Sequence, residues 1–243
     1  MAAMIEPRIM EHPVPEPPAL GEENGLAYAL FMPPGDPEAG VVILHGAGSG
    51  KESHYDFARA CRAQGLAALS FDARGHGSSE GEWGPGVFED ARAMSDLMRR
   101  HVPRVALRGT SMGGFTAIHA AALDRTVFAV VAVCPAQEDM LARSLRSGAL
   151  PDFSVDVEGS VRWLEGLDIG DAAAALAGRC ALLLMHAEGD EQVPYTASQE
   201  IFERAGEPKR LLLMPGGHHR SLQHDPEMQS ASIRWIERSL RKQ

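Results

Sequence analysis

A serine between two glycines lies in the part of the sequence with the clearest chemistry. The segment Val105–Leu123 reads VALRGTSMGGFTAIHAAAL, and Gly109, Ser111 and Gly113 form the pattern G-x-S-x-G. Flanking glycines remove side chains that would collide in a tight turn from a strand into a helix, and that turn exposes the serine hydroxyl. An apolar run precedes the motif and an alanine-rich run follows it, as this geometry requires. The pattern therefore predicts a nucleophilic Ser111 at the amino end of a helix.

A serine nucleophile needs a base, and the base needs an acid that orients it. Two later loops offer both: MHAEGDEQVP at Met185–Pro194 and PGGHH at Pro215–His219. Asp190 is the best acid because it lies in the turn that leads into the next helix, with Glu188 and Glu191 as competitors. Each of the two adjacent histidines in the second loop is a candidate base.

The glycine-rich stretch VVILHGAGSGKESHY at Val41–Tyr55 raises the possibility of a phosphate-binding loop. Such a loop requires G-x-x-x-x-G-K followed by serine or threonine. His45 stands where the first glycine should be, and Glu52 follows Lys51, so the pattern fails at both ends. The histidines near the carboxyl terminus, at positions 218, 219 and 224, match neither H-E-x-x-H nor a Cys/His finger. We therefore predict neither phosphate nor metal binding.

Composition and charge narrow the classes of protein further. The chain has 243 residues and a formal net charge of −10, so it lacks the excess of Lys and Arg that binding to nucleic acid or to an anionic membrane surface uses. Its three cysteines form no CxxC pair and are interpreted as reduced, buried thiols of a cytoplasmic protein. Residues 1–24 are rich in Pro and Glu with no apolar centre, so we expect an amino-terminal extension and neither a signal peptide nor an anchor.

Short apolar runs alternate with stretches of helical spacing along the remainder of the chain, which predicts a doubly wound, mostly parallel α/β sheet. The expected strands are Ala27–Met32, Val41–Leu44, Leu66–Phe71, Val105–Arg108, Phe128–Val133, Cys180–Met185 and Leu211–Met214. The expected helices are Tyr55–Gln64, Val87–His101, Met112–Leu123, Thr196–Ala205 and Pro226–Arg241.

One interval between strands is longer than a crossover needs. Residues 135–179 hold three further stretches of helical spacing separated by glycines, which indicates a small helical lid inserted into a single domain that spans residues 25–243. Binding pockets are mostly apolar, so Phe153 and Trp163 are candidates for substrate contacts from this lid. The alternative is a decorated crossover whose aromatic residues only pack onto the core.

Four segments resemble the α/β-hydrolase superfamily, of the serine-aminopeptidase-like and dienelactone-hydrolase-like kind, from about residue 25 onward. They are LHGAGSG, FDARGHGSS, GTSMGG, and GDEQVP followed by PGGHH. The resemblance implies Ser111 as nucleophile, Asp190 as acid, His218 or His219 as base and no cofactor. Aligning PGAGH, common in similar hydrolases, on PGGHH favours His219. Dienelactone hydrolases carry cysteine at the elbow and haloalkane dehalogenases carry aspartate, so this chain departs from both.

The resemblance also implies an oxyanion hole. Similar hydrolases direct a backbone amide of the turn after HG at the substrate oxygen, which assigns the first donor to Ala47 and the second to Met112. The expected function is cleavage of a small carboxylic ester, thioester or amide through an acyl-serine, by a chain that acts alone or as a homodimer. A small aminopeptidase, an acyltransferase and a non-catalytic ligand-binding relative are the alternatives, and fold alone does not choose among them.

Overall fold

A computed structural model of the protein describes residues 16–150 and 153–241. Eight strands form one sheet in the order β1-β2-β4-β3-β5-β6-β7-β8, antiparallel at β1–β2 and β2–β4 and parallel elsewhere. This confirms the predicted doubly wound sheet. The strands are β1 (Ala19–Glu23), β2 (Leu26–Phe31), β3 (Ala39–Leu44), β4 (Ala67–Phe71), β5 (Arg104–Thr110), β6 (Val127–Val133), β7 (Ala181–Ala187) and β8 (Lys209–Met214).

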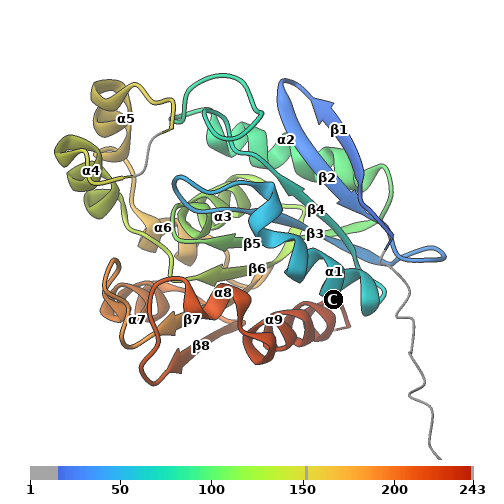
Figure 1. Ribbon diagram of the computed structural model, residues 1–243. Coiled ribbons are helices and arrows are strands. Elements are labelled where there is room, and N and C mark those ends of the chain that lie inside the picture. The colour runs from blue at the N-terminus through green and yellow to red at the C-terminus, as the bar shows by residue number, and fades with distance from the viewer. Residues whose placement is uncertain (1–15, 151–152, 242–243) are drawn as a thin grey trace, which may run out of the picture.

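Helices cover both faces of this sheet (Figure 1). One face packs against α1 and α9, and the other packs against α2, α3 and α7. No helix in residues 16–150 and 153–241 is long and apolar enough to span a bilayer. The helices are η1 (Lys51–His54), α1 (Tyr55–Ala63), α2 (Val87–Arg99), α3 (Met112–Leu123), α4 (Glu138–Ser147), α5 (Val157–Leu164), α6 (Ile169–Ala174), α7 (Tyr195–Arg204), α8 (Ser221–His224) and α9 (Pro226–Leu240).

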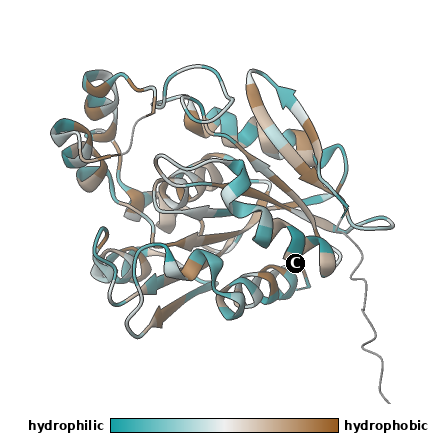
Figure 2. Ribbon diagram, in the orientation of Figure 1, coloured by the Kyte–Doolittle hydropathy of each residue, from teal (hydrophilic) through white to brown (hydrophobic). Residues whose placement is uncertain are grey.

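The central strands are apolar along their whole length because helices cover them on both sides. Every residue of β3, β4, β6 and β7 is buried, and Figure 2 shows these strands in brown among helices whose outer faces are teal. Fully covered parallel strands carry continuous apolar runs, which is why the sequence pattern identified them. Their carboxyl ends share one edge of the sheet, where open α/β sheets place their sites.

The amino-terminal boundary of the domain needs a correction. The sequence predicts an extension over residues 1–24, but β1 pairs with β2 over five residues, so the domain already includes Ala19. Asn24 and Gly25, with φ of 55° and 74°, make the two-residue turn between the strands. Asn-Gly is a strong hairpin signal, and it was the available clue. Residues 1–15 of the expected extension lie outside the described residues.

The expected lid consists of α4, α5 and α6, and short backbone contacts attach it to the domain. Ser154 accepts a hydrogen bond from the Trp83 amide (2.8 Å) and donates one to the Gly75 carbonyl (2.9 Å). Helix α4 packs on α5, whereas α6 packs on α3 and α7. The lid therefore rests on the loop that follows β4 and on one helical face of the domain.

Candidate active site

The turn after β5 holds Ser111 in a conformation that few non-glycine residues adopt. Its φ is 54° and its ψ is −119°. Such a backbone costs on the order of 1–3 kcal/mol and persists only where the surroundings enforce it. Here the Ser111 amide donates to the Val133 carbonyl (2.9 Å), and the Ser111 carbonyl accepts from the amides of Phe115 (3.0 Å) and Ala136 (3.2 Å). The strain and these bonds fix the position of the hydroxyl.

The glycines around the serine are required by close backbone packing, as the motif predicts. A Cβ on Gly109 would lie 2.0 Å from the Gly113 carbonyl oxygen. A Cβ on Gly113 would lie 2.2 Å from the Leu44 carbonyl oxygen. Helix α3 thus approaches β3 and β5 more closely than any side chain would allow.

Asp190 and His219 meet in a hydrogen bond of 2.7 Å between Oδ2 and Nδ1. The Asp190 side chain is fully buried, and 7% of the His219 side chain is exposed. The other carboxylate oxygen, Oδ1, accepts hydrogen bonds from the amides of Gln192 and Val193, each at 2.9 Å. The carboxylate is therefore locked, and it fixes the orientation of the imidazole that binds it.

A second histidine, which the sequence analysis did not identify, lies on the same carboxylate. His186 Nε2 donates to the Val193 carbonyl (2.9 Å) and lies 3.3 Å from Asp190 Oδ2, while its Nδ1 accepts from the Ser198 hydroxyl (2.7 Å). Burial alone would raise the pKa of Asp190, but hydrogen bonds from His186, His219 and the Val193 amide outweigh it and hold that pKa well below its usual range. Asp190 is consequently ionised across the physiological pH range.

The competing residues of the two loops occupy other positions. Glu191 Oε2 accepts a hydrogen bond from the His219 amide (3.1 Å), so it holds the backbone of the loop and does not contact the ring. His218 is exposed, and its Nδ1 accepts from the Arg220 amide (3.3 Å). Of the two adjacent histidines, the structure brings His219 to the carboxylate.

These residues gather at the carboxyl edge of the sheet. Ser111 follows β5, Cys134 follows β6, Asp190 follows β7 and His219 follows β8. Cys134 Sγ, an Asp190 oxygen and a His219 nitrogen all lie within 4.8 Å of one another. Because the Ser111 amide bonds to Val133, the residue before Cys134, the nucleophile turn lies beside this group. Burial holds the pKa of the Cys134 thiol well above its usual range, so the thiol is protonated at neutral pH.

In the described part of the chain the Ser111 hydroxyl forms no hydrogen bond with His219. In enzymes without substrate such a bond is often long, and it tightens when substrate binds. The histidines that suggested a metal site are separated instead. His224 Nδ1 bonds to Asp56 (2.9 Å), and Asp225 caps α9 through the amides of Glu227 and Met228.

Two backbone amides close in sequence to the nucleophile turn and to the loop beside it have no internal partner among the described residues. The amides of Ala47 and Met112 form no hydrogen bond within residues 16–150 and 153–241. Met112 is the first residue of α3, where orphan amides and the helix dipole favour negative charge. A Cβ added to Gly46 would lie 3.3 Å from the Cβ of Ser111. The loop that carries Ala47 therefore passes directly over the serine.

Side chains of the neighbouring loops hold this backbone in place. His45 Nδ1 donates to the Gly46 carbonyl (2.8 Å), and its Nε2 accepts from the Ala73 amide (2.9 Å). Lys51 Nζ forms a buried ion pair with Asp72 Oδ2 (2.7 Å), whose Oδ1 accepts from the Lys51 amide (2.7 Å). The lysine of the glycine-rich stretch is therefore a structural cross-link between η1 and the loop after β4.

The two lid aromatics take different positions. Trp163 packs against Phe88, Phe115 and Trp83, with distances of 5.2–6.0 Å between ring centroids. It anchors α5 on the domain. Phe153 stacks on His76 (4.3 Å), which in turn meets the His45 ring at 5.0 Å. Phe153 is thus connected to the loop over the serine, and Trp163 is part of the apolar layer below it.

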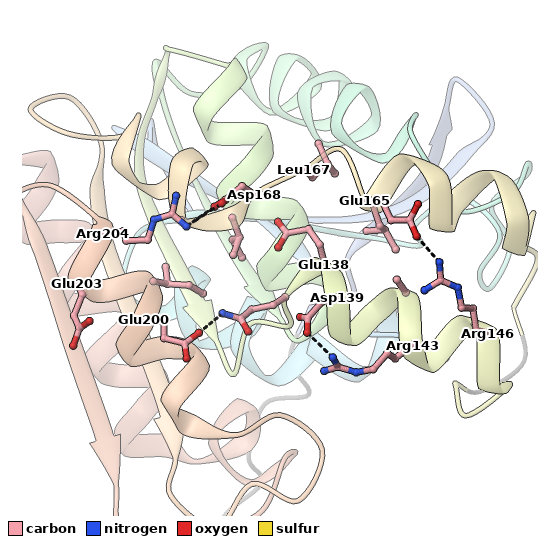
Figure 3. A pocket seen from close by; sticks show the side chains of 16 residues that line it. Glu138, Asp139, Arg143, Arg146, Glu165, Leu167, Asp168, Glu200, Glu203 and Arg204 are labelled. Atoms are coloured by element: carbon pink, nitrogen blue, oxygen red, sulfur yellow. Dashed lines mark hydrogen bonds and ion pairs between the residues drawn. The ribbon is translucent and has the colours of Figure 1, made fainter.

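A cavity of about 780 Å³ lies between α4, α6 and α7 (Figure 3). Its lining includes none of Ser111, Asp190 and His219. Its three arginines are paired within the lining, and Gln137 bonds to Glu200, so a ligand would find few free cations. The pairs are Arg143–Asp139, Arg146–Glu165 and Arg204–Asp168. The cavity is a gap between lid and domain, separate from the acid and histidine pair.

Comparison with known proteins agrees with this geometry. The family described as serine aminopeptidase, S33, matches residues 35–150, a little less than half of the chain. The uncharacterized protein YfhR of Salmonella typhimurium is 26% identical over 205 residues, which cover 79% of this chain and 70% of the relative.

Solved structures share the fold over nearly the whole chain. Est1E from Butyrivibrio proteoclasticus superposes with a TM-score of 0.73 at 21% identity, covering 93% of this chain and 99% of that one. A monoacylglycerol lipase from Paleococcus ferrophilus gives 0.68 at 23% identity, with 90% and 99% covered. The chain therefore has the α/β-hydrolase fold, and residues 35–150 are similar to the serine aminopeptidase family.

Proposed function

We propose that this protein is a cofactor-independent serine hydrolase that cleaves a small carboxylic ester, with Ser111, His219 and Asp190 as its catalytic residues. The observation that carries the proposal is the 2.7 Å hydrogen bond that His219 donates to the buried Asp190, at the same sheet edge as a strained Ser111. The proposed nucleophile, acid and base follow three strands that end at the same edge of the sheet, in the chain order serine, aspartate, histidine, which supports acyl transfer.

The proposed reaction follows from the hydrogen-bonding capacity of each group. His219 Nε2 takes the Ser111 proton as Oγ attacks the ester carbonyl, and the amides of Ala47 and Met112 donate to the oxyanion. The intermediate expels the alcohol, which receives the proton from His219. Water, deprotonated by the same histidine, then releases the acyl group and restores Ser111. Removal of one such oxyanion donor typically costs about 3–4 kcal/mol.

An ester is favoured over a peptide as substrate. In the described part of residues 135–179, the lid adds three short helices and no large domain that would select peptides. Est1E and the monoacylglycerol lipase, which share the fold, bear the names of ester-cleaving enzymes. We propose that Phe153, through its stack on His76 beside the loop over the serine, contacts the acyl group, and that Trp163 supports it from below.

A fluorophosphonate probe tests the nucleophile directly. We expect one covalent label per chain on Ser111 and none on Ser111→Ala, with p-nitrophenyl acetate or butyrate hydrolysed by the wild type only. A panel of p-nitrophenyl esters of increasing acyl length then defines the pocket. An unlabelled wild-type protein that is correctly folded would favour a non-catalytic relative.

The match to serine aminopeptidase S33 favours a small aminopeptidase as the second candidate. It uses the same three residues, so the nucleophile test does not separate it from an esterase. Comparing kcat/KM for aminoacyl p-nitroanilides with that for p-nitrophenyl esters does. Preference for the anilides by more than about tenfold would replace the esterase proposal.

A further inference from the structure

Five buried polar atoms lie behind the nucleophile strand without a hydrogen-bond partner in the described part of the chain. They are Nε and Nη1 of Arg108, both ring nitrogens of His54 and Oγ1 of Thr110. The three residues are only 1–2% exposed. Arg108 and Thr110 lie two and four residues after Ala106 on β5, so they share its face and point toward the layer formed by α1, α8 and α9. His54 directly precedes α1 and enters the same layer.

Arg108 is a buried cation with no carboxylate at ion-pair distance among the described residues. Its guanidinium lies 4.0 Å from the centre of the Phe57 ring, and its Nη2 donates to the Gln223 carbonyl (3.3 Å). The acid of this region, Asp56, is taken up by His224 (2.9 Å) and Gln229 (2.7 Å). Burial lowers the pKa of Arg108 only to about 10, so it remains charged at neutral pH. An uncompensated buried charge is strongly unfavourable.

The unpartnered atoms are mostly donors. Arg108 offers N–H groups on two nitrogens, and Thr110 offers a hydroxyl. Burial, and then the Arg108 charge, lower the pKa of His54 well below its ordinary value, so its ring is neutral with one N–H and one acceptor. A water molecule would bring two more donors to this set. An anion accepts from all of them and neutralises the guanidinium.

We propose that Arg108, His54 and Thr110 bind a small monovalent anion of the halide class between β5, η1 and α8. The anion would hold α8 against the strand, because Gln223 of α8 already binds the same guanidinium. Helix α8 begins two residues after His219, so the bound anion would also stabilise the loop that carries His219, the proposed base. The site itself does not depend on the proposed hydrolase function.

Thermal unfolding in sodium chloride and in sodium gluconate, at constant total ionic strength, tests the proposal in solution. Gluconate is too large for an enclosed halide site, so only chloride should bind and stabilise the folded protein. We expect Tm to rise by at least about 2 °C as the chloride concentration increases from 0 to 0.3 M in place of gluconate. The rise should disappear in Arg108→Met and shrink in Arg108→Lys, which keeps the charge with fewer donors.

Arg104→Met is the matched control, because Arg104 lies on the same face of β5 and stacks on Phe128 at 5.0 Å, but is partly exposed. It should retain the chloride-dependent rise. Equal Tm values in the two salts, or an equal loss of the rise in both methionine variants, would overturn the proposal.

Diffraction from crystals grown in sodium bromide locates the ion even if Arg108→Met does not fold. We expect an anomalous peak within about 3.5 Å of Arg108 Nε or Nη1, and a weaker one in Thr110→Val, which removes one donor with little change in shape. Density for water alone, without anomalous signal, would overturn the proposal. That result would leave the fluorophosphonate labelling of Ser111 unaffected.

Discussion

Different kinds of interaction hold the residues at the carboxyl edge of the sheet and those of the lid. At the edge, backbone hydrogen bonds and a buried carboxylate fix each side chain, as with Ser111 on Val133 and His219 on Asp190. In the lid, ring contacts of Trp163 and a surface ion pair between Arg204 and Asp168 provide most of the attachment, beside two backbone hydrogen bonds of Ser154. Directional bonds at short distances do not tolerate displacement, whereas ring packing and exposed ion pairs do. Substitutions at the edge should therefore abolish chemistry, and substitutions in the lid should adjust it.

Ser111→Ala should produce the largest effect. We expect kcat/KM for p-nitrophenyl esters to fall by at least about 10³-fold, because no other group supplies the nucleophile. Tm should stay within about 2 °C, since Gly109 and Gly113 permit the turn whichever small residue occupies it. Residual hydrolysis above a few per cent of the wild type would refute the assignment of Ser111.

The adjacent histidines provide a matched pair at the same edge. His219→Ala should lower kcat/KM by about 10²–10⁴-fold, the usual contribution of a general base. His218→Ala should change it by less than about fivefold, because His218 is exposed and contacts only its own loop. If the two values are exchanged in the same ester assay, the base is His218 and the hydrolase proposal survives.

Motifs predicted the edge because its constraints are local in sequence. The two glycines of GTSMG allow the close packing of α3 on β5 and β3, so their spacing in the sequence predicts the turn. The choice of Asp190 over Glu191 followed from its place in the turn, and the structure shows Glu191 on the His219 backbone instead. His186 was missed because it lies inside an apolar strand and no motif marks it, although its partners Asp190, Val193 and Ser198 are close in sequence. The buried Arg108 was missed because its partner Gln223 is distant in sequence.

The lid could be predicted only as an insertion with helical spacing. Trp163 and Phe153 are both aromatic residues in an amphipathic region, and nothing in that pattern states which ring packs on Phe88 and which on His76. Strand β1 was missed for another reason. Its five residues include two glutamates and lie half exposed at the edge of the sheet, so they lack the apolar run that marked the other strands.

Asp190→Asn tests how strongly charge holds the edge. The pKa of Asp190 is depressed in the folded state, so its contribution is complete above the unfolded value of about 4 and is lost as the pH falls below it. At pH 7 we expect the free energy of unfolding to drop by about 3 kcal/mol, since the carboxylate is fully buried between two histidines. Urea denaturation at pH 7 and pH 3 should show a smaller difference between the proteins at pH 3. An equal difference at both pH values would mean that Asp190 stabilises the edge through its hydrogen bonds and not through its charge.

In the lid, Trp163→Ala should reduce the free energy of unfolding by about 2 kcal/mol, because it removes a partly exposed ring from three aromatic neighbours. Phe153→Ala should cost less stability and shift the acyl-length preference of kcat/KM. The measurements are urea denaturation and the p-nitrophenyl ester series on both variants. If neither variant changes the acyl preference, the lid supports the domain without contacting substrate.

The smallest effect is expected from the surface ion pairs of α4. Arg143 and Asp139 lie four residues apart at 2.6 Å, with 67% and 62% of their side chains exposed. Such pairs contribute little, because water screens the charges and two long side chains lose rotamer freedom. Arg143→Ala should therefore lower Tm by less than about 1 °C and leave the ester preference unchanged. The Arg143 side chain also lines the cavity beside the lid. A change in acyl preference without a change in Tm would therefore show that substrate extends into that cavity, so that the lid as well as the sheet edge would contact substrate.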